Sequence, residues 1–147
     1  MQIVGFNLTK ISVERSSNFK RVPINTSIEF TNIEKEKIDV LKDQEAVKVN
    51  FKFAILHGEG DQNSPPKEED ILGSAKFEGS IILSTEKEEA KKIQKSWKKK
   101  ELEPAFQVPL YNFILRKCSP KAVQLADDIG LPSHLQIPQI KPRQNSN

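Results

Sequence analysis

Residues 46–56 read AVKVNFKFAIL, and apolar and polar side chains alternate along most of this stretch. The apolar side chains of one parity are Val47, Val49, Phe51, Phe53 and Ile55. Because successive side chains of a strand point to opposite faces of a sheet, this period of two predicts a strand with one buried face. Parallel sheets are covered on both faces, so a half-polar strand indicates an antiparallel sheet.

Three further segments carry the same one-sided pattern. Residues 24–31 and 73–84 each place their apolar side chains on one parity. Residues 2–14 change phase between Leu8 and Ile11, as an inserted bulge or bend would produce. The sequence therefore predicts a four-stranded antiparallel sheet.

Two helices are expected in the C-terminal half, which makes the fold class α+β. Thr85 and Glu88 have the spacing of a capping box, and a lysine-rich helix with a narrow apolar stripe should follow them. The main helix follows Pro104, with apolar residues every three or four positions until Gly130 and Pro132 end it. Pro120 should either kink this helix or split it, with Ser119 capping the second half.

The remaining segments are expected to be irregular. Residues 57–70, HGEGDQNSPPKEED, predict a mobile connection between two neighbouring strands. Residues 131–142 contain three prolines and predict an extended path, anchored by Leu135, Ile137 and Ile140. We expect a single domain over residues 1–142 and a disordered tail over residues 143–147.

Composition limits the class of protein. The 147 residues are 36% hydrophobic and 29% charged, which suits one globular domain. No apolar run approaches the roughly 20 residues of a membrane span, and residues 1–20 lack the features of a secretion signal, so a cytoplasmic location is expected. One cysteine, Cys118, and two separated histidines predict neither an internal disulfide nor a zinc or other metal site.

Catalysis and cofactor binding are not expected. His57 falls in the predicted loop and His134 in the proline-rich segment, and no nucleophile-elbow, Walker or dinucleotide-binding motif is present. Cys118 lies in register with the apolar positions of the main helix, where a buried, unreactive thiol is the commoner outcome. No catalytic residue is therefore assigned.

Positive charge gathers in the second half of the chain. Residues 86–147 hold twelve basic and seven acidic side chains, whereas residues 1–85 hold eleven and thirteen. The lysines of residues 87–100 could bind phosphates, although that segment contains no arginine and its one aromatic residue, Trp97, is needed by the apolar stripe. A solvated helix face is favoured, and a nucleic-acid-binding module is kept as the alternative.

The main helix carries more apolar surface than one sheet can cover. Its apolar side chains point in nearly every direction around the axis: Val108, Leu110, Tyr111, Phe113, Ile114 and Leu115. Such a helix must be covered from two sides, which predicts a partner subunit or a client chain. The alternative is that the first strand or residues 131–142 cover the second face within a monomer.

The order of these features resembles the bacterial export chaperone family SecB. The resemblance runs from about Ile11 to Ile140. Its motifs are the glycine-containing strand segment EGSI at 78–81, the proline-led helix start PLY at 109–111, the helix end GLP at 130–132 and the segment LPSHLQIP at 131–138. The opening GFNLTKISVER and the lysine-rich helix with its tryptophan look closer to the SecB-like proteins of archaea.

The resemblance implies a SecB-like protomer that assembles as a dimer of dimers and binds unfolded or pre-secretory polypeptides without ATP. On this basis we expect six residues to contact polypeptide: Tyr111, Ile114, Leu115, Leu131, Leu135 and Ile137. Leu110, Phe113 and Ile81 are expected at the oligomer interface. A partner-specific chaperone of the toxin–antitoxin type is a further alternative on the same fold.

Two features depart from the family pattern. SecB chaperones are typically acidic and dock the translocation ATPase SecA through acidic sheet surface, whereas this chain has a pI of about 8.9 and a net charge of +3. Docking to SecA is therefore not expected. The family's long helix is not usually interrupted by a proline such as Pro120.

Overall fold

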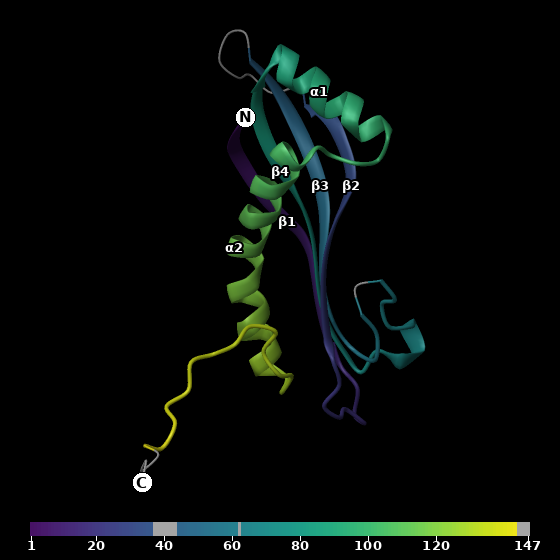
Figure 1. Cartoon of the computed structure of the whole chain (residues 1–147), viewed down its shortest axis with the longest axis vertical. Coiled ribbons are helices and arrows are strands. Elements are labelled where there is room, and N and C mark those ends of the chain that lie inside the picture. The colour runs from purple at the N-terminus through teal and green to yellow at the C-terminus, as the bar shows by residue number, and fades with distance from the viewer. Residues whose placement is uncertain (37–43, 62, 144–147) are drawn as a thin grey trace.

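The computed structural model describes residues 1–36, 44–61 and 63–143. Its centre is a four-stranded antiparallel sheet in the order β1-β4-β3-β2 (Figure 1). The strands are β1 (Gln2–Arg15), β2 (Ile24–Glu36), β3 (Gln44–His57) and β4 (Gly73–Glu86). The sheet and the α+β class predicted from the alternation are confirmed.

The core lies on one face of the sheet. Phe51 of β3 pairs with Phe30 of β2 and Gly79 of β4, and in antiparallel ladders such partners share a face. All the odd-numbered apolar residues of β3 from Val47 to Ile55 are buried, as the alternation predicts. The opposite face carries polar side chains, including the ion pair of Lys52 Nζ with Glu78 Oε1 at 3.4 Å.

The two edge strands are interrupted and the two central strands are not. The register of β1 against β4 shifts between Ile3 and Gly5 and again between Leu8 and Lys10. The second shift confirms the predicted change of phase, because it places Leu8 and Ile11 on the same face. The register of β2 against β3 shifts once, next to Phe30.

Helix α1 (Lys87–Lys98) lies across one end of the sheet, with Ala90 and Ile93 buried beneath it (Figure 1). The predicted capping box is wrong. Thr85 is still part of β4, where it pairs with Glu45 and donates its hydroxyl to the Glu45 carbonyl oxygen at 3.4 Å. The N-cap position belongs to Glu86, which makes no side-chain capping hydrogen bond.

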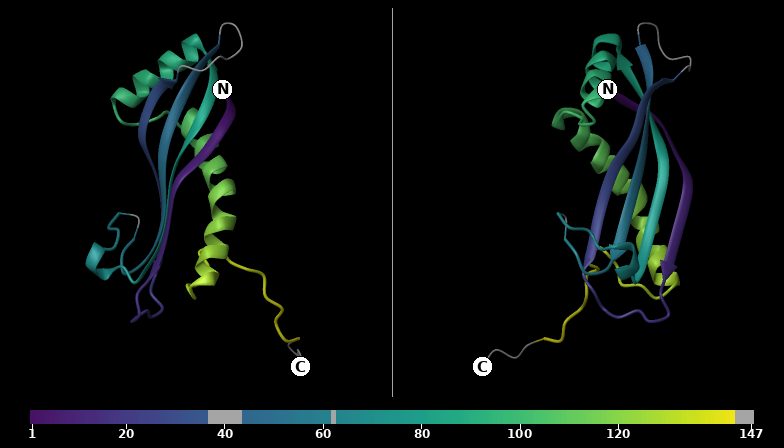
Figure 2. Two further views of the ribbon diagram at one scale, coloured as in Figure 1. Left: turned by 180° about the vertical axis from the view of Figure 1, so that it is seen from behind. Right: turned by 90° about the vertical axis from the view of Figure 1, so that its right-hand side faces the viewer.

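Helix α2 (Pro104–Asp128) runs along the sheet, as the two views of Figure 2 show. It begins at Pro104, whose missing N–H costs nothing in the first turn. The helix is continuous through Pro120, so it is not split there. Its end is the predicted one: Gly130 has a φ of 76°, and the Leu131 N–H donates to the Ala126 carbonyl at 2.8 Å.

His57 is not a loop residue, contrary to the prediction. It is the last residue of β3, is 1% exposed, and accepts a backbone hydrogen bond from Leu72 at 2.8 Å. After it, the carboxylate of Asp61 accepts backbone hydrogen bonds from Asn63 and Ser64 at 2.8 and 2.7 Å, and the Asp61 carbonyl accepts one from the Asn25 side chain. The described part of this connection is therefore hydrogen-bonded to itself and to β2.

The segment after α2 is extended, as predicted, but its predicted anchors are wrong. Leu135, Ile137 and Ile140 are 48%, 56% and 102% exposed, whereas Leu131 is 5% exposed. Leu131 anchors the segment because Gly73 leaves room for its side chain against β4. In the predicted disordered tail, residues 144–147 lie outside the described residues. No described helix is both long enough and apolar enough to cross a membrane.

Candidate functional site

One row of α2 is buried against the sheet and completes the core. Its residues recur every four positions: Leu110, Ile114, Cys118, Ala122 and Ala126. Positions four apart lie one above another on a helix, so this row forms a single stripe. The stripe settles which of the apolar residues of α2 belong to the core.

Aromatic pairs hold the two flanks of this stripe. Tyr111 stacks on Phe30 of β2 with ring centroids 5.0 Å apart, and its hydroxyl accepts a hydrogen bond from Gln107 at 3.0 Å. Phe113 meets Phe6 of β1 edge to face at 5.5 Å. These contacts fix the rotation of α2 about its axis, and thereby which face it turns outward.

An open groove of about 980 Å³ lies along the outward flank of α2. The α2 residues in it include Val108, Asn112, Leu115 and Arg116, whose spacing of four, seven and eight places them on one side of the helix. Ile3 of β1 and Leu135 of the C-terminal segment complete its lining, together with Pro109, Ser119 and Pro120. The groove is therefore built from three separate parts of the chain.

The lining is apolar and partly accessible. Val108 is 52% exposed and Leu135 is 48% exposed, while Ile3 and Leu115 are half-buried. The polar contributions are Asn112, Ser119 and Arg116. A surface of this kind can bury apolar side chains of another molecule and leaves few polar groups that require hydrogen-bond partners.

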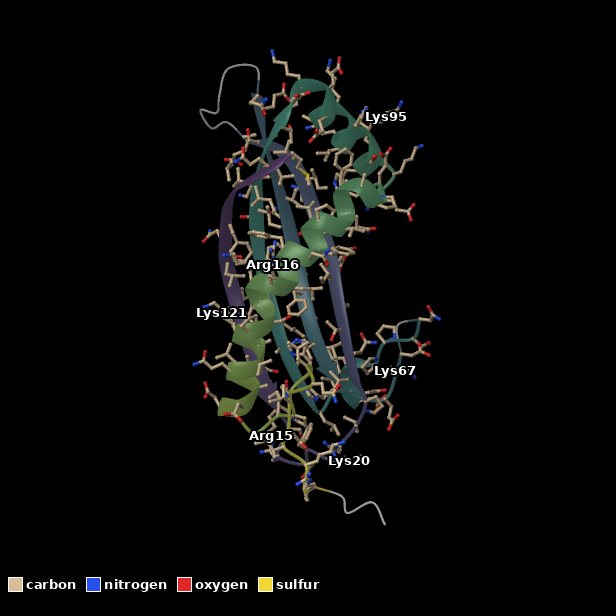
Figure 3. The ribbon with its side chains drawn as sticks, turned by 60° about the vertical axis from the view of Figure 1, so that its left-hand side comes forward. Arg15, Lys20, Lys67, Lys95, Arg116 and Lys121 are labelled. Atoms are coloured by element: carbon tan, nitrogen blue, oxygen red, sulfur yellow. The ribbon has the colours of Figure 1, made fainter. Side chains whose placement is uncertain are left out.

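The charge beside the groove is positive. Arg116, Lys117 and Lys121 are exposed on α2, and Figure 3 labels Arg116 and Lys121 along the helix. The Lys117 ammonium lies 5.7 Å from the ring centre of Phe113. Within the described ranges none of the three forms an ion pair, and residues 104–126 contain no acidic side chain.

The six residues expected to contact polypeptide do not lie together. Leu115 and Leu135 line the groove. Ile114 and Leu131 are in the protomer's interior, at 0% and 5% exposed, and Tyr111 faces β2. Ile137 lies farther along the C-terminal segment, in a separate surface hollow.

The three residues expected at an oligomer interface lie within the protomer. Ile81 and Leu110 are 0% and 1% exposed, and Phe113 is half-buried against Phe6. The residues that sequence reasoning missed are Ile3, Val108 and Arg116. The helical spacing of Val108 and Arg116 could have revealed those two, but nothing near Ile3 in the sequence links it to α2.

The thiol and the two imidazoles do not line the groove. Burial raises the pKa of the Cys118 thiol to about 11, so the sulfur is a packing group at neutral pH. Burial also lowers the pKa of His57 and of His134 below 6.5. In the described part of the chain, no group of three or more potential metal ligands is present.

The lysines of α1 form a solvated face, as favoured from the sequence. Lys91, Lys92, Lys95 and Lys98 are exposed, while Trp97 is half-buried and packs against the core. The hollow beside these lysines is also lined by Glu101 and Glu103, among others. The aromatic ring is thus engaged in packing, and carboxylates lie beside the cations.

No protein-family model matches this chain, and no curated protein matches it either. Among solved structures, the chain is similar to a SecB-like chaperone of Mycobacterium tuberculosis, determined in complex with a ChAD peptide from the HigA1 antitoxin. The two share 15% sequence identity, the match covers 97% of this chain and 92% of that one, and the TM-score is 0.43. The likeness is too slight to carry function from that chain to this one.

Proposed function

We propose that this protein is a SecB-like chaperone that holds apolar segments of unfolded polypeptides in the α2 groove without using ATP. The observation that carries the proposal is the open, apolar groove beside a helix whose core-facing stripe is already buried. Two sequence resemblances support the same proposal. The order of the sequence features resembles that of SecB, and the opening segment of this chain resembles that of archaeal SecB-like proteins.

The proposed activity requires an accessible apolar surface and no catalytic group. Apolar side chains of a client would gain about 25 cal/mol for each Å² removed from water, and many weak contacts of this kind bind a chain without fixing its sequence. Val108 and Leu115 offer such contacts from positions two turns apart on α2, and Leu135 offers them from the C-terminal segment.

The cations beside the groove give the client a preferred charge. Arg116, Lys117 and Lys121 have no carboxylate partner among the described residues, so acidic residues flanking an apolar segment would meet complementary charge. Charges at a rim change association rate and specificity more than they change affinity. We therefore propose that apolar segments with acidic flanks bind faster than those with basic flanks.

The test measures whether the protein suppresses aggregation of another polypeptide. A chemically unfolded client is diluted into buffer without nucleotide, and its aggregation is monitored by light scattering. The wild-type protein should reduce scattering in proportion to its concentration. Leu115→Asp places a charge in the groove and should weaken this effect, because a buried unpaired carboxylate is unfavourable. Gln124→Asp is the matched control, since Gln124 is exposed on α2 outside the groove.

The client preference is tested with labelled peptides that share one apolar core and differ only in acidic or basic flanks. The wild-type protein should bind the acidic-flanked peptide faster, and Arg116→Glu should reduce or reverse the difference. Equal association rates for both peptides would refute the charge preference but not the proposal that peptides bind in the groove. A pull-down that yields one dominant protein would identify a partner-specific chaperone in place of a general one.

Assembly as a dimer of dimers is part of the proposal and is tested by solution mass from light scattering. Two of the residues first expected at the interface are buried in the protomer and Phe113 is half-buried, so we propose that a second copy uses the outward flank of α2. A tetramer that dissociates on Leu115→Asp would show that copies share the groove. A monomer that still suppresses aggregation would refute the proposed assembly, and the groove would then serve polypeptide binding alone.

A further inference from the structure

The two histidines of this chain are 77 positions apart in the sequence, yet both lie where the segment after α2 packs on the sheet: the His134 ring contacts Phe53 of β3, and His57 ends the same strand beside Leu131. His57 ends β3 and is 1% exposed, and the ring of Phe19 meets it edge to face at 5.8 Å. His134 is half-buried, and its ring meets Phe53 edge to face at 6.3 Å. Aromatic rings therefore shield both imidazoles from water.

Each histidine has a buried ring nitrogen without a hydrogen-bond partner, namely His57 Nδ1 and His134 Nε2. Two carboxylate oxygens share that condition, but Glu45 forms an ion pair with Lys35 and Glu89 forms one with the amino group of Met1. Buried polar atoms in native proteins normally have partners, and exceptions often serve a purpose. Among the described residues, the two histidines are thus the ones whose buried ring nitrogens have neither a hydrogen bond nor an ion pair.

Among the described residues, no carboxylate forms a hydrogen bond or ion pair that would stabilise a proton added to either ring. The segments around the pair carry several titratable groups, all exposed, and none forms a hydrogen bond or ion pair with either ring: Glu14, Arg15, Lys20, Arg21, Asp70, Asp127 and Asp128. The guanidinium of Arg15 lies 5.5 Å from the centre of the Phe19 ring, so it adds positive charge near His57. Burial lowers the pKa of both histidines, and the charge of His134 lowers that of His57 further.

The same segment connects the histidines to the groove. Leu131 is buried against Gly73, where an added Cβ would lie 2.5 Å from Leu131 Cδ2 and 3.4 Å from His57 Cδ2. Leu135, next to His134 in sequence, lines the groove. Beyond this point the chain leaves the body of the protein, as the yellow trace in Figure 1 shows. When residues 131–135 pack on the sheet, they therefore place His134 near His57 and Leu135 in the wall of the groove at the same time.

We propose that protonation of His57 and His134 releases residues 131–135 from the sheet and removes the Leu135 wall, so that the groove is formed at neutral pH and lost on mild acidification. Burial disfavours the charged form of both docked rings, whereas a released imidazole titrates near 6.5. Docking is then favoured above that value and weakens as the pH falls below it towards the lowered pKa of the docked rings, since the released state binds more protons. The release does not depend on the proposed function, whereas its effect on the groove does.

Mobility of the segment tests the release without any client. Gln136→Cys provides an exposed site for a nitroxide label, while Cys118 stays unlabelled because it is buried and its pKa is about 11. The label should be restricted at about pH 8 and mobile at about pH 5.5. Leu131→Asp, which removes the anchor, gives the reference spectrum of the released segment. Emission from Trp97 should stay constant, because that residue lies on α1 at the other end of the sheet (Figure 1).

Two further variants separate protonation from general acid sensitivity. Glutamine is neutral at every pH, so His134→Gln should abolish most of the change in mobility, and His57→Gln is the second test if the first misfolds. A label that is equally mobile at both pH values in the wild type, or a transition that persists unchanged in a folded His134→Gln variant, would overturn the proposal.

Peptide binding measured on the same samples separates the two proposals. Binding at neutral pH that is lost with the release supports both. If the segment becomes mobile at low pH but no peptide binds at any pH, the pH-dependent release is supported and the proposed function is refuted. Binding that stays equal while the segment moves overturns the link between the histidine pair and the groove.

Discussion

Phe113 of α2 and Phe6 of β1 meet edge to face, with ring centroids 5.5 Å apart, and Phe6 also stacks on Phe51 at 5.9 Å. The three rings connect α2, an edge strand and the centre of the sheet. Phe113 was expected to contact another subunit, yet it packs against the protomer's own first strand. The contact holds the helix that carries most of the groove.

Phe113→Ala should lower the free energy of unfolding by about 2 kcal/mol, less than for a fully buried phenylalanine because the ring is half-buried. Urea denaturation followed by circular dichroism measures this. Lys117→Ala is the control, since it removes the cation above the ring and leaves the ring in place. A loss as small as that of the control would mean that Phe113 does not support α2 in the protomer.

Gly130→Ala should cost about 1 kcal/mol of stability, because Gly130 has a φ of 76° and an alanine there is strained. The cost is conformational, since the nearest atom to an added Cβ is 3.9 Å away on Arg15. Gly130→Asn should cost less, because asparagine tolerates this backbone region better. Thermal unfolding of the two variants gives the comparison, and equal losses would contradict the explanation.

Cys118 should react slowly with thiol reagents in the folded protein at neutral pH. Its pKa is raised to about 11, so the reactive thiolate is scarce, and the side chain is buried. The rate should rise on adding urea, and it should rise with pH in the folded state over the range in which the protein stays folded. Rapid labelling of the native protein near neutral pH would show that α2 opens at this position.

Nucleic acid should bind weakly at most. The exposed lysines of α1 can attract phosphates, but Trp97 is half-buried and packs against the core, which limits its stacking on bases. Any complex with single-stranded RNA at low salt should disappear steeply as salt is added, because counterion release would be its main source of affinity. Retention at physiological salt that Lys95→Ala reduces would instead favour the nucleic-acid-binding alternative.

The sheet could be predicted because its pattern is local. Alternation from Val47 to Ile55 needs no knowledge of the partner strands, and the phase change after Leu8 is visible in β1 alone. The end of α2 at Gly130 is equally local, since it depends on one positive φ. Such features follow from backbone geometry that each residue type allows.

The site was harder to predict because it depends on distant contacts. Thr85 has the sequence of a helix cap, but pairing with Glu45 keeps it in the sheet. Ile114 and Leu115 are neighbours of similar polarity, and which of them faces the core depends on the packing of α2 against β1 and β2. Ile3 joins the groove because the edge strand passes beside α2, and the local sequence does not encode that approach.

The register shifts in both edge strands limit what another chain can pair with on this sheet. A long, regular edge presents an unbroken row of amide and carbonyl groups on which another chain can add as a strand, and such growth leads to aggregates. The irregularities beside Ile3 and Leu8 in β1, and beside Phe30 in β2, interrupt that row while β3 and β4 stay regular inside. The sheet is thereby protected from acting as a template for fibril growth, whatever polypeptide comes close to it.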